Sequence, residues 1–114
     1  MNINFNDIAT QTLTGLHGGS GDLVARIHSG KFGTVMPCRL QPGASIGMHS
    51  HEGLEIIYVL YGCGTVVCDG VEEPLFIDMC HICPPGCEHS ITNTGDAELV
   101  MLQAELAVNC CRAK

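Results

Sequence analysis

The stretch GASIGMHSHEGLEIIYVLYG occupies residues 43–62 and contains two histidines, His49 and His51, followed by Glu55. Alternate side chains of a β-strand lie on the same face, so His49 and His51 are expected to point the same way. Glu55 shares their parity, but four residues of straight strand would carry it about 13 Å away from His51. The chain must therefore turn at residues 52–53 for Glu55 to reach the imidazoles, and Glu55 would then begin a second strand beside the first.

This pattern predicts a metal site or, in a simpler interpretation, a polar strand edge. A buried imidazole or carboxylate costs free energy unless it is hydrogen-bonded, paired or bound to an ion. Two histidines and one carboxylate on adjacent strands form a facial set of metal ligands with open positions. A histidine on a strand is, however, usually a surface residue, so these three residues alone leave both interpretations open.

The same stretch resembles the first sequence motif of the cupin family. The matching positions are Gly43-x5-His49-x-His51-x3-Glu55-x6-Gly62. A second cupin motif, G-x5-P-x-G-x2-H-x3-N, is matched further along by Pro84, Gly86, His89 and Asn93. Its leading glycine is replaced by Asp78, a residue type that tolerates turn geometry. Together the two motifs cover roughly residues 43–93.

The resemblance implies an all-β, single-domain protein with the cupin jelly roll, a double-stranded β-helix that forms a barrel. It also implies one divalent transition metal ion (Fe, Mn, Ni, Co, Cu or Zn) bound by His49, His51, Glu55 and His89. Three imidazole nitrogens and one carboxylate oxygen suit all of these metals, so the ligand set does not choose between them. Glu55 is also the candidate catalytic residue, because the sequence indicates no other general base beyond a metal-bound hydroxide.

Outside the motifs, short apolar runs alternate with turn signals from residue 23 onward. Two of these signals are Asp69-Gly70 and the segment 94–96, each between β-prone runs. Many short strands with tight turns indicate an antiparallel sandwich or barrel. We expect an N-terminal extension or loop over residues 1–22, a cupin β-barrel domain over residues 23–107 and a C-terminal tail over residues 108–114.

The chain of 114 residues carries a formal net charge of −7, with five lysines and arginines against twelve acidic residues. Nucleic acids and anionic membrane surfaces both attract clustered basic residues, so we expect neither as a partner. The first residues, MNINFNDIAT, lack the basic start and the apolar segment of a secretory signal. We therefore expect a cytoplasmic protein.

Cysteines are numerous for a chain of this length. The eight are Cys38, Cys63, Cys68, Cys80, Cys83, Cys87, Cys110 and Cys111. In a cytoplasmic protein we expect reduced thiols rather than a disulfide framework. Cys80 and Cys83 have the C-x-x-C spacing of a structural zinc pair, but a second such pair is missing and the cupin pattern already explains the segment. Cys87 has the parity of His89, so it either faces the ion or packs as a small apolar residue.

Five residues are expected to line a pocket beside the metal. They are Ile57, Val59, Tyr61, Met101 and Gln103. The first three share the parity of Glu55 on one strand, and Gln103 is a candidate for orienting a substrate. The scarcity of polar groups in this set favours a small or partly apolar substrate. The remaining histidines, which are His17, His28 and His81, are expected at the surface.

The resemblance leaves two classes of function. The first is a metal-dependent enzyme that acts on a small molecule inside the barrel, of the oxygenase, isomerase or lyase type. The alternative is a non-catalytic cupin that binds or senses a small molecule or a metal. Fold alone does not decide between them. In either case we expect a homodimer, because pairing through exposed strands would cover a sheet edge.

Overall fold

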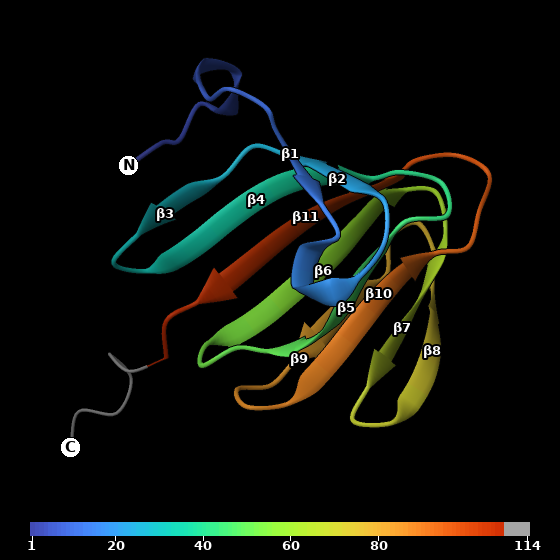
Figure 1. Ribbon diagram of the computed structural model, residues 1–114. Helices are drawn as coiled ribbons and strands as arrows, with labels where there is room; N and C mark the ends of the chain where they lie inside the picture. The colour runs from blue at the N-terminus through green and yellow to red at the C-terminus, as the bar shows by residue number, and fades with distance from the viewer. Residues whose placement is uncertain (109–114) are drawn as a thin grey trace.

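The computed structural model describes residues 1–108 and consists of two antiparallel β-sheets that face each other (Figure 1). The first sheet has seven strands: β1 (Gln11–Thr14), β2 (Asp22–Ala25), β4 (Gly33–Leu40), β11 (Leu99–Leu106), β6 (Leu54–Tyr61) and β9 (Cys80–Cys83) in this spatial order, with β3 (His28–Gly30) also paired to β4. The second sheet has four, in the order β5 (Ser45–Ser50), β10 (Glu88–Asn93), β7 (Gly64–Cys68) and β8 (Val71–Leu75). Two short 3-10 helices, η1 (Phe5–Asp7) and η2 (Leu16–Gly18), flank β1.

Successive strands cross from one sheet to the other. From β4 to β7 the chain alternates between the first and the second sheet, and it does so again from β9 to β11. Residues that are close in the sequence therefore reach opposite layers of the molecule. The predicted all-β architecture is confirmed.

Side chains that point between the two sheets form the core. Along β6, the buried residues Glu55, Ile57 and Val59 alternate with the partly exposed Ile56 and Tyr58. Complete burial of an aliphatic side chain contributes about 1.5–3 kcal/mol to the free energy of unfolding. The remaining core residues are Leu23, Ala25, Cys38, Leu40, Ala44, Ile46, Val66, Leu75, Ile91, Leu99 and Met101. One face of β6 thus supplies both core side chains and a buried carboxylate.

The alternation along β6 ends at Leu60. On the paired strand β11, Val100 pairs with Tyr61, and the next residue, Met101, pairs with Val59. Leu60 therefore has no partner on β11 and is an extra residue in the ladder. Such a bulge reverses the parity of the residues beyond it. Tyr61 is consequently 55% exposed, although its sequence spacing from Glu55 predicts an inward direction.

The segment expected as an N-terminal loop contains a strand. β1 pairs antiparallel with β2 and extends the first sheet, and Leu13 packs against the core. The hydroxyl of Thr14 donates a 2.6 Å hydrogen bond to Asp22, which ties the two strands together. Without β1, the edge of β2 would leave backbone N–H and C=O groups unpaired, and residues 11–14 pair with these groups. Most of the predicted C-terminal tail, residues 109–114, lies outside the described residues.

Asp78, which replaces the leading glycine of the second motif, has a left-handed backbone with φ of 70°. That conformation costs a non-glycine residue roughly 1–2 kcal/mol, and Asp and Asn adopt it most readily. The carboxylate of Asp78 accepts a 2.6 Å hydrogen bond from the hydroxyl of Tyr58, which anchors the turn. Aspartate therefore maintains a backbone geometry for which the motif has glycine.

None of the helices within residues 1–108 is long and apolar enough to span a membrane.

Candidate metal centre

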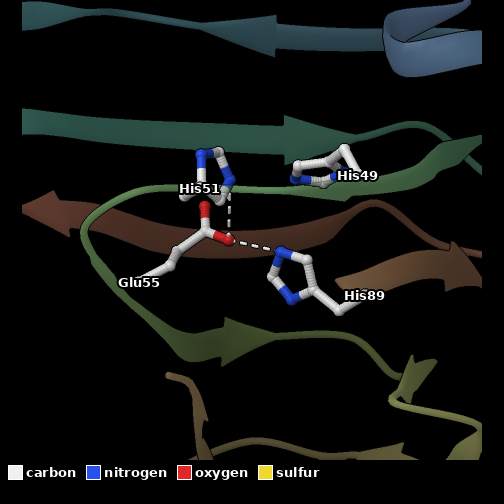
Figure 2. Close-up of side chains that lie close together, drawn as sticks. All are labelled: His49, His51, Glu55 and His89. Carbon is white, nitrogen blue, oxygen red and sulfur yellow. Dashed lines mark ion pairs between the residues drawn. The ribbon is translucent and has the colours of Figure 1, made fainter. Parts of the chain in front are cut away.

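Four side chains from the two sheets converge at one point between them (Figure 2). His49 lies in β5, His51 directly follows β5, Glu55 lies in β6 and His89 lies in β10. One potential ligand atom of each lies within 4.8 Å of those of the other three. His49 and His89 are direct cross-strand partners, so their side chains lie on the same face of the second sheet. The structure brings together the four residues that the sequence predicts as ligands.

The turn between His51 and Glu55 makes this convergence geometrically feasible. It passes through Glu52 and Gly53 and carries the chain from the second sheet to the first. A Cβ atom on Gly53 would lie only 2.5 Å from the backbone oxygen of Leu106. Glycine is therefore needed for the turn to pack against the end of β11.

The polar atoms at the centre of this cluster are buried and closely spaced. His89 is 0% exposed and Glu55 is 5% exposed. The Oε1 atom of Glu55 lies 2.5 Å from Nε2 of His89 and 3.2 Å from Nε2 of His51. In spite of these short separations, the three atoms have no hydrogen bond of acceptable geometry. Unsatisfied buried polar atoms are costly, so a cluster of three directed at one point fits a bound cation.

The opposite nitrogen of each imidazole contacts a protein group. Nδ1 of His49 donates a 2.7 Å hydrogen bond to the carbonyl oxygen of Gly47. Nδ1 of His51 lies 3.1 Å from a carboxylate oxygen of Glu105, and Nδ1 of His89 lies 3.1 Å from Nε2 of His81. A partner on Nδ1 fixes the ring orientation and the tautomer, which leaves the Nε2 lone pair for a metal. The Nε2 atoms of His51 and His89 both lie within 3.2 Å of Oε1 of Glu55, as ligands directed at one ion would.

A cavity of about 230 Å³ borders this cluster on one side. Its lining is Leu16, His17, Ile27, Ser29, Thr34, Met36, Ile46, His49, His51, Glu55, Gln103 and Glu105. Of the five predicted pocket residues, only Gln103 is part of this lining. Ile57, Val59 and Met101 are fully buried in the core between the sheets. Tyr61 lies at another surface hollow beyond the β6 bulge, so the structure does not bring it to the cluster.

Comparison with known proteins identifies the family. The cupin domain profile matches residues 37–105, which is more than half of the chain. This chain belongs to the cupin family. The cupin is also 33% identical over 110 residues to an oxalate-binding protein from Thermotoga maritima, with 90% of each chain covered.

Solved structures show the same fold. The crystal structure of a predicted oxalate decarboxylase from Thermotoga maritima has a TM-score of 0.84 to this cupin and 29% identity, and the match covers 94% of this chain and 100% of that one. A single-residue variant of oxalate decarboxylase from Bacillus subtilis has a TM-score of 0.74 and 20% identity over 91% of this chain and 29% of its own. The second likeness concerns the fold alone. The cupin jelly roll expected from the sequence is confirmed.

In this cupin, the protonation states of two of the clustered groups suit a metal. Burial lowers the pKa of His49, so its imidazole is neutral at pH 7. Burial by itself would raise the pKa of Glu55, but the contact with His89 and the neighbouring imidazoles outweigh burial and lower it. A neutral imidazole and an ionised carboxylate are the forms that coordinate a cation. Three nitrogens and one oxygen fit a divalent transition metal and leave open positions on a six-coordinate ion.

Three residues of the site were not found by sequence reasoning, which placed His17 and His81 at the surface and did not single out Glu105. Glu105 has the parity of Gln103 on β11, so strand periodicity alone could have indicated it. His81 is buried at 8% exposure because it alternates with the exposed Cys80 along β9. The side of β9 that faces the interior was not evident from the sequence.

No sequence signal indicates His17, whose place depends on the docking of a loop. Its ring stacks on that of His49 with centroids 4.0 Å apart and planes 11° from parallel. η2 can approach β5 this closely because Gly47 has no side chain: a Cβ atom there would overlap the backbone oxygen of His17. The stacked ring covers one face of His49 and restricts its movement.

Proposed function

We propose that this cupin binds one divalent transition metal ion through His49, His51, Glu55 and His89, and that the ion binds a small dicarboxylate of the oxalate type. The observation that carries the metal site is the convergence of four potential ligand atoms within 4.8 Å of one another, two of which, Nε2 of His51 and of His89, lie 3.2 Å and 2.5 Å from the Glu55 carboxylate. The similarity to an oxalate-binding protein over 90% of the chain supports the dicarboxylate.

The charges around the cavity make metal-dependent binding necessary for such a ligand. Among the described residues that line the cavity there is no lysine or arginine, whereas Glu55 and Glu105 contribute two carboxylates. A dianion entering the metal-free cavity would face like charges at short range. A bound divalent cation would supply the positive charge that the ligand needs and act as a Lewis acid toward it. Gln103, which lines the cavity, is the candidate to hydrogen-bond a carboxylate.

The first experiment separates metal binding from ligand binding. The protein is stripped with a chelator and reloaded with Mn, Fe, Co, Ni, Cu or Zn, and elemental analysis gives the metal content. Calorimetric titration with oxalate then follows for the loaded and the metal-free forms, with acetate as the control anion. We expect one ion at this centre and oxalate binding only when the ion is bound. Equal oxalate affinity with and without metal would contradict the proposal.

Conversion of the bound ligand is the second candidate function and corresponds to the lyase type. The similarity to a predicted oxalate decarboxylase favours it among the three enzyme types. Decarboxylation places a proton on the carbon that loses carbon dioxide, and Glu105, a half-buried carboxyl group on the cavity wall, is a candidate donor. Formate production by the metal-loaded protein would establish the lyase, and oxalate binding without product would establish the binding protein. Oxygen uptake measured in parallel tests the oxygenase type.

We also propose a cytoplasmic homodimer. The outer face of the first sheet is apolar, with Leu60, Ile82 and Leu102 on β6, β9 and β11 all exposed. Covering such a patch removes apolar surface from water. Light scattering coupled to size-exclusion chromatography should give twice the chain mass, and Leu102→Glu should give the monomer mass. A monomeric wild type would contradict this assembly.

A further inference from the structure

A second cluster of metal-binding side chains lies beside the first in the interior. It consists of Cys68 at the end of β7 and His81 and Cys83 on β9, and one potential ligand atom of each lies within 4.8 Å of the other two. Cys83 is 1% exposed, His81 is 8% exposed and Cys68 is half-buried. All three thiol and imidazole groups come from strands that face each other across the two sheets.

The strand register explains why the two clusters are neighbours. In the second sheet, His89 pairs directly with Cys68, and in the first sheet Glu55 pairs directly with Cys83. Directly paired residues of neighbouring strands place their side chains on the same face of a sheet. The thiols therefore lie one strand away from the metal centre in each sheet. His81 connects the two clusters through its 3.1 Å contact with His89.

The cysteine pair in this cluster is not the one that sequence spacing suggests. Along β9 the burial of side chains alternates, so Cys80 is exposed while His81 and Cys83 are buried. On a strand, C-x-x-C places its two thiols on opposite faces, whereas residues two apart share a face. The partner of Cys83 is Cys68, which is 15 positions away and belongs to the other sheet.

The geometry points to a second metal site formed by Cys68, His81 and Cys83, selective for a thiophilic ion such as Zn²⁺. Ligand atoms on one tetrahedral zinc ion lie roughly 3.5–4 Å apart, so a small movement of these three side chains suffices. Two thiolates also neutralise a divalent cation, which matters in a buried location. The nitrogen and oxygen donors of the first centre lack this preference for soft ions.

A cavity borders this cluster, and the thiols carry protons that a metal ion would displace. His81 also borders a cavity of about 240 Å³ on the side of β8 and β9, lined in part by Glu73 and Pro74. Without an ion, burial and the neighbouring Cys68 raise the pKa of Cys83 to about 12, so its thiol is protonated and unreactive at pH 7. Ion binding releases the two thiol protons to water and forms two metal–sulfur bonds without any oxidant. When His89 also holds an ion, one further proton leaves the His81–His89 pair, because the two contacting nitrogens then share a single proton.

Cobalt titration is the test, because thiolate–Co²⁺ charge transfer absorbs in the near ultraviolet and nitrogen or oxygen ligation does not. The full chain carries Cys110→Ser and Cys111→Ser to remove the adjacent C-terminal thiols. We expect a second equivalent of Co²⁺ that produces this absorption. It should persist in His49→Ala/His51→Ala, which lacks the first centre, and disappear in Cys68→Ser/Cys83→Ser. His81 is left unchanged because it contacts both clusters.

Cys80→Ser is the matched control, since Cys80 lies on the same strand as Cys83 but faces outward, and this variant should retain the absorption. Absorption that survives in Cys68→Ser/Cys83→Ser, or that is lost in Cys80→Ser, would overturn the proposal. If the double variant does not fold, alkylation of the folded parent protein gives the answer. Zn²⁺ should protect Cys68 from iodoacetamide and leave Cys80 reactive, and equal labelling of Cys68 with and without Zn²⁺ would overturn the proposal.

Discussion

The imidazole centre (His49, His51, Glu55 and His89) and the thiol cluster (Cys68, His81 and Cys83) are built in the same way, but only the first could be predicted from the sequence. Each contains two residues in i, i+2 spacing, His49 with His51 and His81 with Cys83, that face the interior. The first pair lies in a complete four-residue motif with short spacings. The pair of His81 and Cys83 needs Cys68 from the opposite sheet. The C-x-x-C spacing instead predicts Cys80 as the partner of Cys83, but Cys80 is exposed. Strand parity, rather than motif spacing, decides which side chains can meet.

The largest expected effect is a difference in alkylation rate between two cysteines of β9, the buried Cys83 and the exposed Cys80. At a given pH, a thiol with a pKa of about 12 forms roughly 1,000-fold less thiolate than one with the ordinary value of 9.0, and only the thiolate is nucleophilic. We therefore expect the buried Cys83 of the metal-free protein to be alkylated by up to about that factor more slowly than the same cysteine in the unfolded chain, and far more slowly than the exposed Cys80. Peptide mass spectrometry over time measures both rates. Similar rates would show that β9 does not hold Cys83 in the interior.

Removal of one imidazole tests the first centre by itself. His51→Ala should weaken metal binding at this centre by at least about 100-fold, since one of four ligands and its Glu105 contact are lost together. The β fold should persist, because His51 lies at a strand end rather than in the core. Elemental analysis and circular dichroism measure the two effects. His28→Ala, on β3, is the control and should retain the metal, and full metal content in His51→Ala would count against the site.

The group behind His51 should have a smaller effect. Glu105→Ala removes the acceptor 3.1 Å from Nδ1 of His51 without removing a ligand, so we expect metal affinity to fall by about 10- to 100-fold. Glu105→Gln keeps an oxygen acceptor and should restore part of the affinity. Glu98→Ala, which removes a carboxylate paired with Arg39 away from the site, is the control. Competition with a chromogenic chelator measures all three. Unchanged affinity in Glu105→Ala would show that the contact does not orient the ligand.

The pH dependence of the free energy of unfolding should give the smallest effect. A group of the first centre should reduce stability in acid, and a group of the thiol cluster should reduce it in alkali. Burial lowers the pKa of His49 below 6.5, so in acid the unfolded chain binds a proton that the folded chain does not. The free energy of unfolding should therefore fall as pH drops below about 6.5. Cys83 has the opposite behaviour: its pKa is raised from 9.0 to about 12, so the unfolded chain loses its proton first. Stability should accordingly fall as pH rises above about 9.

Denaturant titrations of the metal-free protein at several pH values measure both slopes. His49→Gln should reduce the acid slope and leave the alkaline slope, and Cys83→Ala should do the reverse. Glu55, whose pKa is lowered, adds to the loss of stability below about pH 4.5 and does not affect the alkaline side. If both variants kept the acid and alkaline slopes of the wild type, neither group would titrate differently in the folded and unfolded states.

Several features could be predicted because they depend on local order. The short apolar runs with turns between them gave the all-β class, and the two motifs gave the four residues that converge. Strand parity gave the wrong direction for Tyr61, because the bulge at Leu60 turns it outward. The pairing of residues 11–14 with β2 was not expected from the sequence. The position of His17 could not be predicted from the sequence either, because it depends on the contact of η2 with Gly47.

By itself, the amino-acid sequence determined which residues can share a face wherever a strand runs without a bulge, since parity along a strand is set by the backbone within a few residues. It also determined the residue types at the centre and the negative charge of the chain. Only the tertiary structure decided which strand lies beside which, and therefore that Cys68 lies next to His89 and Cys83 next to Glu55. Cross-strand register is fixed by the packing of the whole core, so no local pattern contains it.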